Sequence, residues 1–235
     1  MEKYDNLVLF DVGGVLLRLD FNLFYEAAAK AAGTTAEEFR KIYADSRLEV
    51  RSLDGTINKN EYFGGIRYLI GKNLTNEEIG LIKERAWASQ IDEMVGLKKR
   101  VYEAGNAVGI LSNTDEHALE TLPVRYPQIY ELFNPSFPQI FSCRMKMMKP
   151  EIKMYNEAEK FGAKKIVFID DKETYAKVPV KELGWHGILF TQYVDKSEAI
   201  RQIEKDKPEE VSHNLRTADS VSTVEKALRE FGVSV

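Results

Sequence analysis

Residues 7–16, LVLFDVGGVL, decide the fold of this chain. The run Leu7–Phe10 is short and apolar throughout, which is typical of a strand buried on both faces of a sheet. It leads directly into Asp11 and then into Gly13 and Gly14. Ligands bind beyond the carboxyl ends of parallel strands, and glycines let backbone amides approach an anion closely. The stretch therefore predicts a strand that carries a carboxylate into a ligand site.

Other apolar runs predict the rest of the sheet. Three of them end at Leu111, Ile169 and Phe190, and a weaker one, QIFSC, ends at Cys143. Helical patterns lie between these runs, over Asp92–Glu103 and Pro150–Phe161. In the second pattern a proline stands just inside the predicted helix start. Apolar strands separated by helices predict an α/β fold, a doubly wound parallel sheet covered on both faces.

One interval is too long for an ordinary crossover. Roughly 75 residues separate the first strand from the helix near Asp92, against a usual minimum of about a dozen. Helix starts recur in this interval. One helix is predicted to start at Asp20 and to stop at Gly33. Three more starts are marked by capping pairs three residues apart: Thr35 and Glu38, Asn58 and Glu61, and Thr75 and Glu78. We predict an α-helical subdomain over residues 20–90, inserted into a core of residues 1–19 and 91–235. In the core, the helical spacing of the last apolar residues of the chain predicts a C-terminal helix over 220–231.

Composition excludes several classes of protein. The chain has 235 residues, 44% of them hydrophobic, which is enough for a full core. Its net charge of -4 comes from interspersed acids and bases, so we expect no nucleic-acid partner and no membrane surface. The lone Cys143 cannot form an internal disulfide, and MEKYDNLVLF has no signal-peptide layout, so we expect a cytoplasmic protein with a small soluble partner. The sequence leaves the oligomeric state open.

Polar residues follow the other predicted strands as well. Ser112 and Asn113 come after the second strand and supply donors for an oxyanion. Lys149 precedes Pro150 at a predicted helix start, where ammonium charge and free N–H groups favour an anion. Asp170 and Asp171 end another strand and are hard oxygen ligands suited to Mg²⁺. Together these residues predict a site for a metal ion and a phosphate group.

These stretches resemble the four motifs of the haloacid dehalogenase (HAD)-like superfamily, in the same order. FDVGGVL is similar to its first motif, LSNT to its second, KPE to its third and VFIDD to its fourth. The likeness covers residues 7–190, and the predicted insertion matches the position of that family's helical cap. Within the family, the glycine two positions after Asp11 and the KPE triplet resemble the sugar-phosphate phosphatase-like branch.

The resemblance implies a Mg²⁺-dependent phosphatase acting on a small phosphorylated metabolite. Asp11 would be the nucleophile and form an aspartyl-phosphate, with Lys149 as the other catalytic residue. The implied metal ligands are Asp11, the Gly13 carbonyl, Asp170 and Asp171, and the implied phosphate-binding residues are Gly14, Ser112, Asn113 and Lys149.

Gly13 departs from the family pattern, because most phosphatases of this superfamily carry a second aspartate there as general acid–base. Such help is worth about 10²–10⁴ in rate. An enzyme without it should select substrates whose leaving group needs no proton, such as a sugar 1-phosphate. Tyr175 is a second departure, beside the expected metal site, where Glu173 is a candidate substitute. Two alternatives stay open: a catalytically degenerate phosphate-binding or regulatory protein, and a 2-haloacid dehalogenase that needs no metal.

Several other residues are weaker candidates. His117, His186 and His213 lack metal-ligand spacing, so we expect no zinc site. Cys143 is better explained as a buried small hydrophobe than as a nucleophile. The cap residues that select the substrate cannot be assigned, and the charges at Arg47, Arg51 and Asp54 are expected to lie on the surface.

Overall fold

The computed structural model describes residues 4–193 and 213–235. Its centre is a six-stranded sheet of order β5-β4-β1-β6-β7-β8, in which every neighbouring pair is parallel. The strands are β1 (Asn6–Phe10), β4 (Ala107–Ser112), β5 (Gln139–Phe141), β6 (Lys165–Asp170), β7 (His186–Phe190) and β8 (Leu215–Ala218). Leu7 to Phe10 are completely buried, as expected for a strand between two others in a covered sheet.

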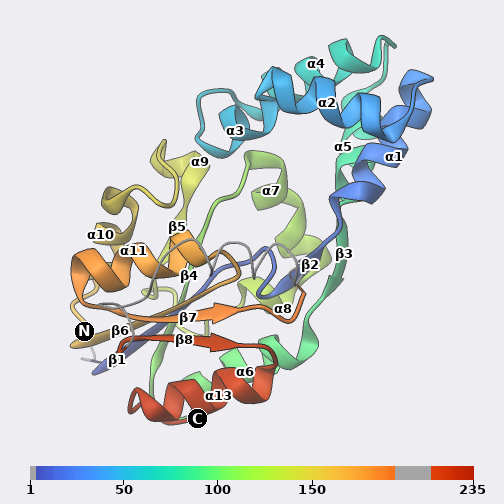
Figure 1. Cartoon of the computed structure of the whole chain (residues 1–235). Helices are drawn as coiled ribbons and strands as arrows, with labels where there is room; N and C mark the ends of the chain where they lie inside the picture. The colour runs from blue at the N-terminus through green and yellow to red at the C-terminus, as the bar shows by residue number, and fades with distance from the viewer. Residues whose placement is uncertain (1–3, 194–212) are drawn as a thin grey trace.

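Helices cover both faces of this sheet (Figure 1). On one face α6 (Asp92–Glu103) packs beside α13 (Val221–Glu230), and on the other α10 (Ile152–Glu159) packs beside α11 (Glu173–Leu183). Shorter helices follow β4 and β5, namely α7 (Glu116–Arg125), α8 (Pro127–Tyr130) and α9 (Ser142–Met145). The doubly wound α/β fold expected from the sequence is confirmed.

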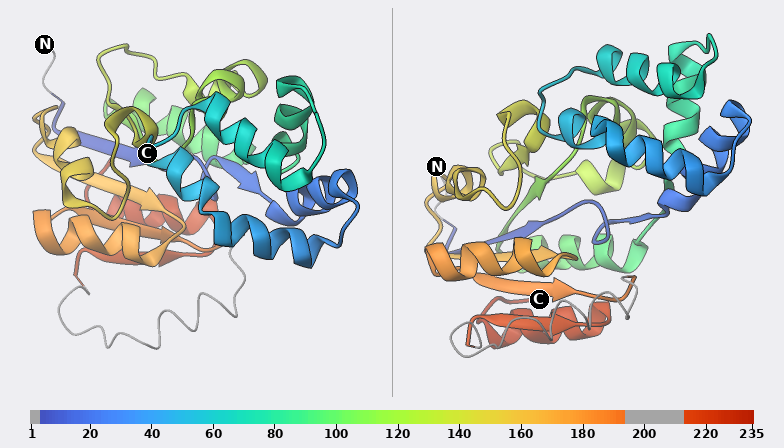
Figure 2. Two further views of the ribbon diagram at one scale, coloured as in Figure 1. Left: turned by 90° about the horizontal axis from the view of Figure 1, so that it is seen from above. Right: turned by 45° about the horizontal axis from the view of Figure 1, so that its top comes forward.

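Five helices lie beyond the carboxyl ends of β1, β4 and β6, apart from the sheet (Figures 1 and 2). We call this group the helical insertion: α1 (Phe21–Ala32), α2 (Ala36–Ser46), α3 (Leu48–Leu53), α4 (Lys59–Ile70) and α5 (Asn76–Glu84). An antiparallel pair, β2 (Leu17–Leu19) and β3 (Trp87–Gln90), connects it to the core. The division of the chain into a core and a cap subdomain at residues 20 and 90 stays a prediction.

Side-chain caps begin most helices of the insertion. Thr35, Asn58 and Thr75 each cap a helix in a reciprocal capping box with the glutamate three residues later. Asp20 caps α1, and Gly33 ends it in the left-handed conformation. These starts and the stop are the ones the sequence predicts, because each side chain satisfies backbone donors that the helix itself leaves free.

The structure corrects three sequence-based expectations. The strand in QIFSC ends at Phe141, because the next residues turn into α9. Pro150 lies outside α10, which begins at Ile152 after Glu151. The polar stretch 206–220 contains β8, an additional edge strand; its residues 206–212 lie outside the described part of the chain.

The C-terminal helix docks on the sheet as its apolar spacing suggests. Val221, Val224 and Leu228 are buried where α13 packs on β7, β8 and α6. Within the described residues, no helix has both the length and the apolar character that a membrane crossing requires.

Candidate active site

The sheet register brings the motif residues to one edge. Phe10 pairs with Ile110 of β4 and with Ile169 of β6, so the residues that follow on the three strands lie side by side. Asp11 therefore stands next to the ends of β4 and β6, where Ser112 and Asp170 are the last strand residues. Parallel pairing is thus the reason that residues distant in sequence converge.

Three carboxylates meet at this edge. One oxygen from each of Asp11, Asp170 and Asp171 lies within 4.8 Å of the others, and Asp11 and Asp170 are 7% and 0% exposed. Burial, followed by repulsion from Asp170 and Asp11, raises the pKa of Asp171. Burial also raises the pKa of Asp170, although Lys149 opposes the shift.

Lys149 is the buried cation of this cluster. Its Nζ lies 2.9 Å from Asp11 Oδ2 and 2.6 Å from Asp170 Oδ2, and it donates to the Leu111 carbonyl at 3.2 Å. Burial alone would lower the pKa of Lys149, but Asp11 and Asp170 outweigh burial and raise it. Three carboxylates against one ammonium leave an excess of buried negative charge, which a divalent cation with oxygen ligands would relieve. The donor set therefore fits such a cation.

Asn113 fixes the segment that carries Lys149. Its Oδ1 accepts from the Lys149 backbone N–H at 2.9 Å, and its Nδ2 donates to the Lys149 carbonyl at 3.1 Å. The Asn113 side chain is thus engaged within the protein. Ser112 is 2% exposed and lines the cavity described below.

The two glycines after Asp11 differ in their surroundings. Gly14 has φ +75°, and a Cβ there would lie 2.2 Å from Asp171 Oδ2, so only glycine fits against this carboxylate. The Gly14 N–H donates to the Leu17 carbonyl at 2.8 Å and is not free for an anion. At Gly13, which lacks a positive φ, a Cβ would meet only the side chain of Leu19, with Cδ1 nearest at 2.8 Å.

A cavity of about 470 Å³ opens above the carboxylates, between the core and the helical insertion. The core contributes Asp11, Asp171 and Ser112 to its lining, and the insertion contributes Glu49, Lys83 and others. The carboxylate cluster at the sheet edge thus opens into a space large enough for a small organic molecule.

The insertion residues in the cavity are not the charged ones that the sequence made conspicuous. Arg47, Arg51 and Asp54 are absent from the described lining, whereas Glu49 and Lys83 belong to it. No local pattern marks Glu49 or Lys83, because their roles depend on how α3 and α5 pack over the core.

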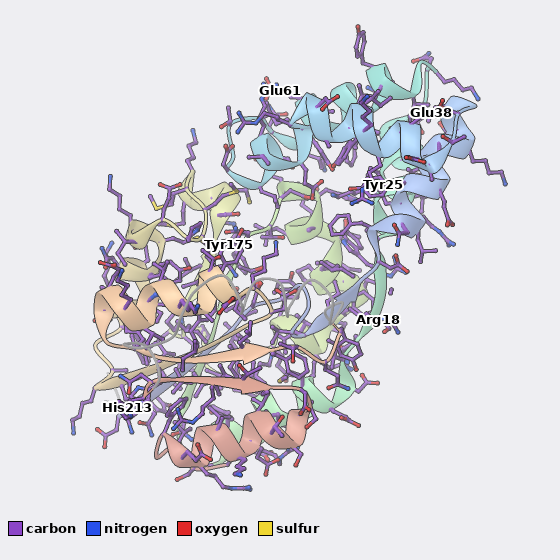
Figure 3. All side chains as sticks on the ribbon, in the orientation of Figure 1. Arg18, Tyr25, Glu38, Glu61, Tyr175 and His213 are labelled. Atoms are coloured by element: carbon purple, nitrogen blue, oxygen red, sulfur yellow. The ribbon has the colours of Figure 1, made fainter. Side chains whose placement is uncertain are left out.

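The other residues that the sequence singled out pack against, or pair with, neighbouring side chains. His117 packs against Phe63 and Trp87, and Cys143 is buried with a pKa raised to about 11, mainly by burial. Tyr175, in the first turn of α11, lines the cavity, with the Lys149 ammonium 5.2 Å from its ring centre (Figure 3). Glu173 pairs with Lys177 at 2.6 Å and does not belong to the carboxylate cluster.

No family model matches the chain. Its structure resembles a HAD family enzyme from Bacteroides thetaiotaomicron, with a TM-score of 0.69 and 26% identity over 85% of this chain and 100% of that one. The same enzyme in complex with magnesium and inorganic phosphate gives a TM-score of 0.67 and 24% identity, over 84% of this chain and 100% of that one. The chain belongs to the HAD-like hydrolase superfamily.

Other HAD-like structures share the fold across different reactions. A HAD phosphatase from Thermococcus onnurineus is 16% identical over 95% of this chain and 97% of its own, with a TM-score of 0.62. L-2-haloacid dehalogenase from Xanthobacter autotrophicus is 14% identical over 96% of this chain and 98% of its own, with a TM-score of 0.61. These likenesses show the HAD-like fold alone, so the reaction has to be inferred from the site.

Proposed function

We propose that this HAD-like hydrolase is a Mg²⁺-dependent phosphatase that hydrolyses a small phosphorylated metabolite through Asp11. The observation that carries the proposal is the cluster of Asp11, Asp170 and Asp171, in which one oxygen of each lies within 4.8 Å of the others and Lys149 pairs with the two buried members, Asp11 and Asp170. The magnesium and phosphate bound by the similar enzyme from Bacteroides thetaiotaomicron support it.

The Asp11 carboxylate attacks phosphorus and displaces the ester oxygen in line. A P–O bond to Asp11 forms as the bond to the leaving group breaks, giving an aspartyl-phosphate and an alcohol once the leaving oxygen gains a proton. Water then adds to this intermediate, releases inorganic phosphate and restores the carboxylate. Lys149 pairs with Asp11 and orients it for the attack.

Asp11, Asp170, Asp171 and the Gly13 carbonyl would hold the metal ion. When bound, Mg²⁺ neutralises the carboxylates and polarises the phosphoryl oxygens, so that two anions can approach each other. Gly14 contributes by its lack of a side chain, which leaves room for Asp171.

Ser112 and the Asn113 backbone are the proposed donors to the phosphoryl oxygens, where transition-state charge accumulates. Lys149 contacts Asp11, Asp170 and the Leu111 carbonyl, so direct contact with phosphate requires exchange of one of these bonds. Its role in the resting site is therefore to position Asp11, and its positive charge favours the incoming phosphate.

A sugar 1-phosphate is the proposed class of substrate. The place beside Gly13 where the family carries its acid is filled by the apolar Leu19 side chain, which gives no proton to a leaving group. An anomeric oxygen leaves as an anion more readily than a primary alkoxide, so the site favours 1-phosphates over 6-phosphates.

The proposal is tested by a phosphate-release screen with Mg²⁺ over sugar phosphates, nucleotides and small acyl phosphates, with EDTA as the matched blank. We expect turnover of sugar 1-phosphates that EDTA abolishes. Chloride release from 2-haloacids in EDTA would instead identify a dehalogenase. Absence of Mg²⁺-dependent turnover across the screen would identify a non-catalytic phosphate-binding protein.

A further inference from the structure

Glu49 is the most tightly held polar residue of the cavity wall. Its Oε2 accepts hydrogen bonds from Lys83 at 2.6 Å, from Tyr62 at 2.9 Å and from Tyr43. The two tyrosine hydroxyls also contact each other at 2.5 Å. Three donors from α2, α4 and α5 therefore fix one carboxylate oxygen of α3 in place.

The second oxygen of Glu49 is left for a ligand. All hydrogen bonds to this carboxylate within the described residues go to Oε2, and the side chain is 25% exposed and lines the cavity. Burial alone would raise the pKa of Glu49, but Lys83 and the tyrosine hydroxyls outweigh it and lower the pKa. Oε1 is thus an ionised, oriented acceptor that requires a donor from the ligand.

Lys83 is not free to bind a second anion. Besides Glu49, its Nζ lies 4.0 Å from Asp115 Oδ2, and the rings of Phe21, Phe24 and Tyr62 lie within 5.5 Å of it. Two carboxylates therefore share one buried ammonium. Apart from the proposed metal ligands Asp11 and Asp171, the described lining carries two carboxylates, Glu49 and Asp115, and two ammonium groups, Lys83 and Lys172, so it has no surplus positive charge for a second anion. This balance disfavours substrates with a second phosphate or a carboxylate.

Aromatic side chains contribute to the remaining wall beside aliphatic ones. The described lining includes the rings of Phe21, Trp87, Tyr175 and Tyr193. Such rings provide flat apolar surfaces for the C–H faces of a ring-shaped ligand, while the carboxylate accepts from its hydroxyl groups.

We propose that Glu49 determines specificity by accepting a hydrogen bond from a hydroxyl group of the substrate's organic part, and that the cavity takes monophosphates of uncharged, hydroxyl-rich molecules such as hexoses. This inference rests on the proposed phosphatase function and names its substrate class. Because Lys83, Tyr43 and Tyr62 hold Glu49 before the substrate arrives, little ordering accompanies binding.

The test compares wild type with Glu49→Gln on two kinds of probe, in Mg²⁺. One is the best of three hexose monophosphates with an anomeric phosphate (glucose, galactose and mannose 1-phosphate), and the other is phenyl phosphate, whose organic part has no hydroxyl group. We expect kcat/KM for the hexose phosphate to fall by about 10- to 100-fold, mostly through KM, since a hydrogen bond to a charged acceptor is lost. Phenyl phosphate should change less than about twofold, because it offers no hydroxyl group to Glu49. Acid catalysis by Glu49 would instead lower kcat for the hexose phosphate and leave KM unchanged.

Arg51→Gln is the matched control, because Arg51 is exposed on the same helix and is absent from the described cavity lining. Glu49→Gln leaves Lys83 buried with fewer partners, so a double variant, Glu49→Gln with Lys83→Met, removes both charges together. Monodeoxy analogues of the best hexose phosphate are compared on wild type and on Glu49→Gln. One missing hydroxyl should reduce kcat/KM by the same 10- to 100-fold, and this difference should vanish in Glu49→Gln.

Equal loss on both probes, or full tolerance of every deoxy analogue by wild type, would overturn the hydroxyl proposal and leave the phosphatase standing. Hydrolysis of phenyl phosphate with no hexose phosphate accepted would do the same. Failure of wild type to release phosphate from either probe would overturn both.

Discussion

Asp11 is the residue on which the proposed chemistry depends. Asp11→Asn keeps the shape of the side chain but removes the attacking charge and one partner of Lys149, which retains Asp170. We expect Mg²⁺-dependent phosphate release to fall by at least about 10³-fold while circular dichroism shows a folded protein. Asp45→Asn, at an exposed position of α2, is the control. Wild-type turnover in Asp11→Asn would exclude this nucleophile.

Gly13 and Leu19 together explain the missing general acid. The backbone at Gly13 permits a side chain, and the obstacle is the end of a flexible leucine. In Gly13→Asp with Leu19→Ala, we expect kcat/KM for a hexose 6-phosphate, relative to the matching 1-phosphate, to rise by about 10². Leu19→Ala alone separates this gain from the effect of added space. A wild-type preference for the 6-phosphate would contradict the leaving-group argument.

Gly14 and Gly33 form a natural pair of test positions, since both have a positive φ, +75° and +78°. Alanine at Gly33 meets no atom within 4 Å, so it should cost only the backbone strain, about 1–2 kcal/mol of unfolding free energy. Alanine at Gly14 also displaces Asp171. We expect the Mg²⁺ concentration for half-maximal activity to rise at least about tenfold in Gly14→Ala alone. An equal shift in Gly33→Ala would show that the effect is not local to the site.

At the scale of helices and strands, the sequence predicted those elements whose signals lie in neighbouring residues. Apolar runs predicted β1, β4, β6 and β7, and paired caps predicted the helix starts of the insertion, because each signal lies within a few residues of its consequence. The edge strand β8 and the pair β2 and β3 were missed. They are short, and their partners lie far away along the chain, so no local pattern marks them.

The same distinction applies to the candidate site. Sequence order predicted that Asp11, Ser112, Asp170 and Asp171 follow strands, and the register brings them together. It did not predict that the Gly14 amide is used by Leu17 or that Glu49 lines the cavity. Both facts arise from tertiary packing, which periodicity does not encode.

Helix α7 carries a pH-dependent contribution to stability. Burial of His117 lowers its pKa, although Glu84 at 3.3 Å opposes the shift. The folded state prefers the neutral ring, so this contribution is present above the unfolded pKa of about 6.5 and is lost as pH falls through the lower folded value. We expect the unfolding free energy of wild type to fall more steeply across this range than that of His117→Gln. His213→Gln, at an exposed position far from the insertion (Figure 3), should retain the wild-type slope.

At the scale of the whole molecule, metal binding should raise the stability of the folded protein against unfolding. A ligand that binds only the folded state at about a hundred times its Kd adds about 2.7 kcal/mol. We expect Mg²⁺ to raise the Tm of wild type in a concentration-dependent way, EDTA to reverse the shift, and Asp171→Asn to show much less of it. Differential scanning calorimetry measures this without any substrate. An identical Mg²⁺ shift in Asp171→Asn would place the metal elsewhere.

The two connections to the helical insertion run side by side as β2 and β3, with a bulge between Arg18 and Leu19. The insertion also contacts α7 of the core through the ion pairs of Lys59 with Glu120 and of Glu84 with Arg125, so any bending at this ribbon has to break surface ion pairs that are individually weak. Because the cavity lies between the insertion and the core, bending at the ribbon would change its width, and substrate entry and product departure would depend on the same motion. A hinge of this kind would make turnover sensitive to solvent viscosity when product departure is slower than the chemical step. Leu19 lies beside both the bulge and Gly13, so it connects the ribbon to the loop that follows Asp11.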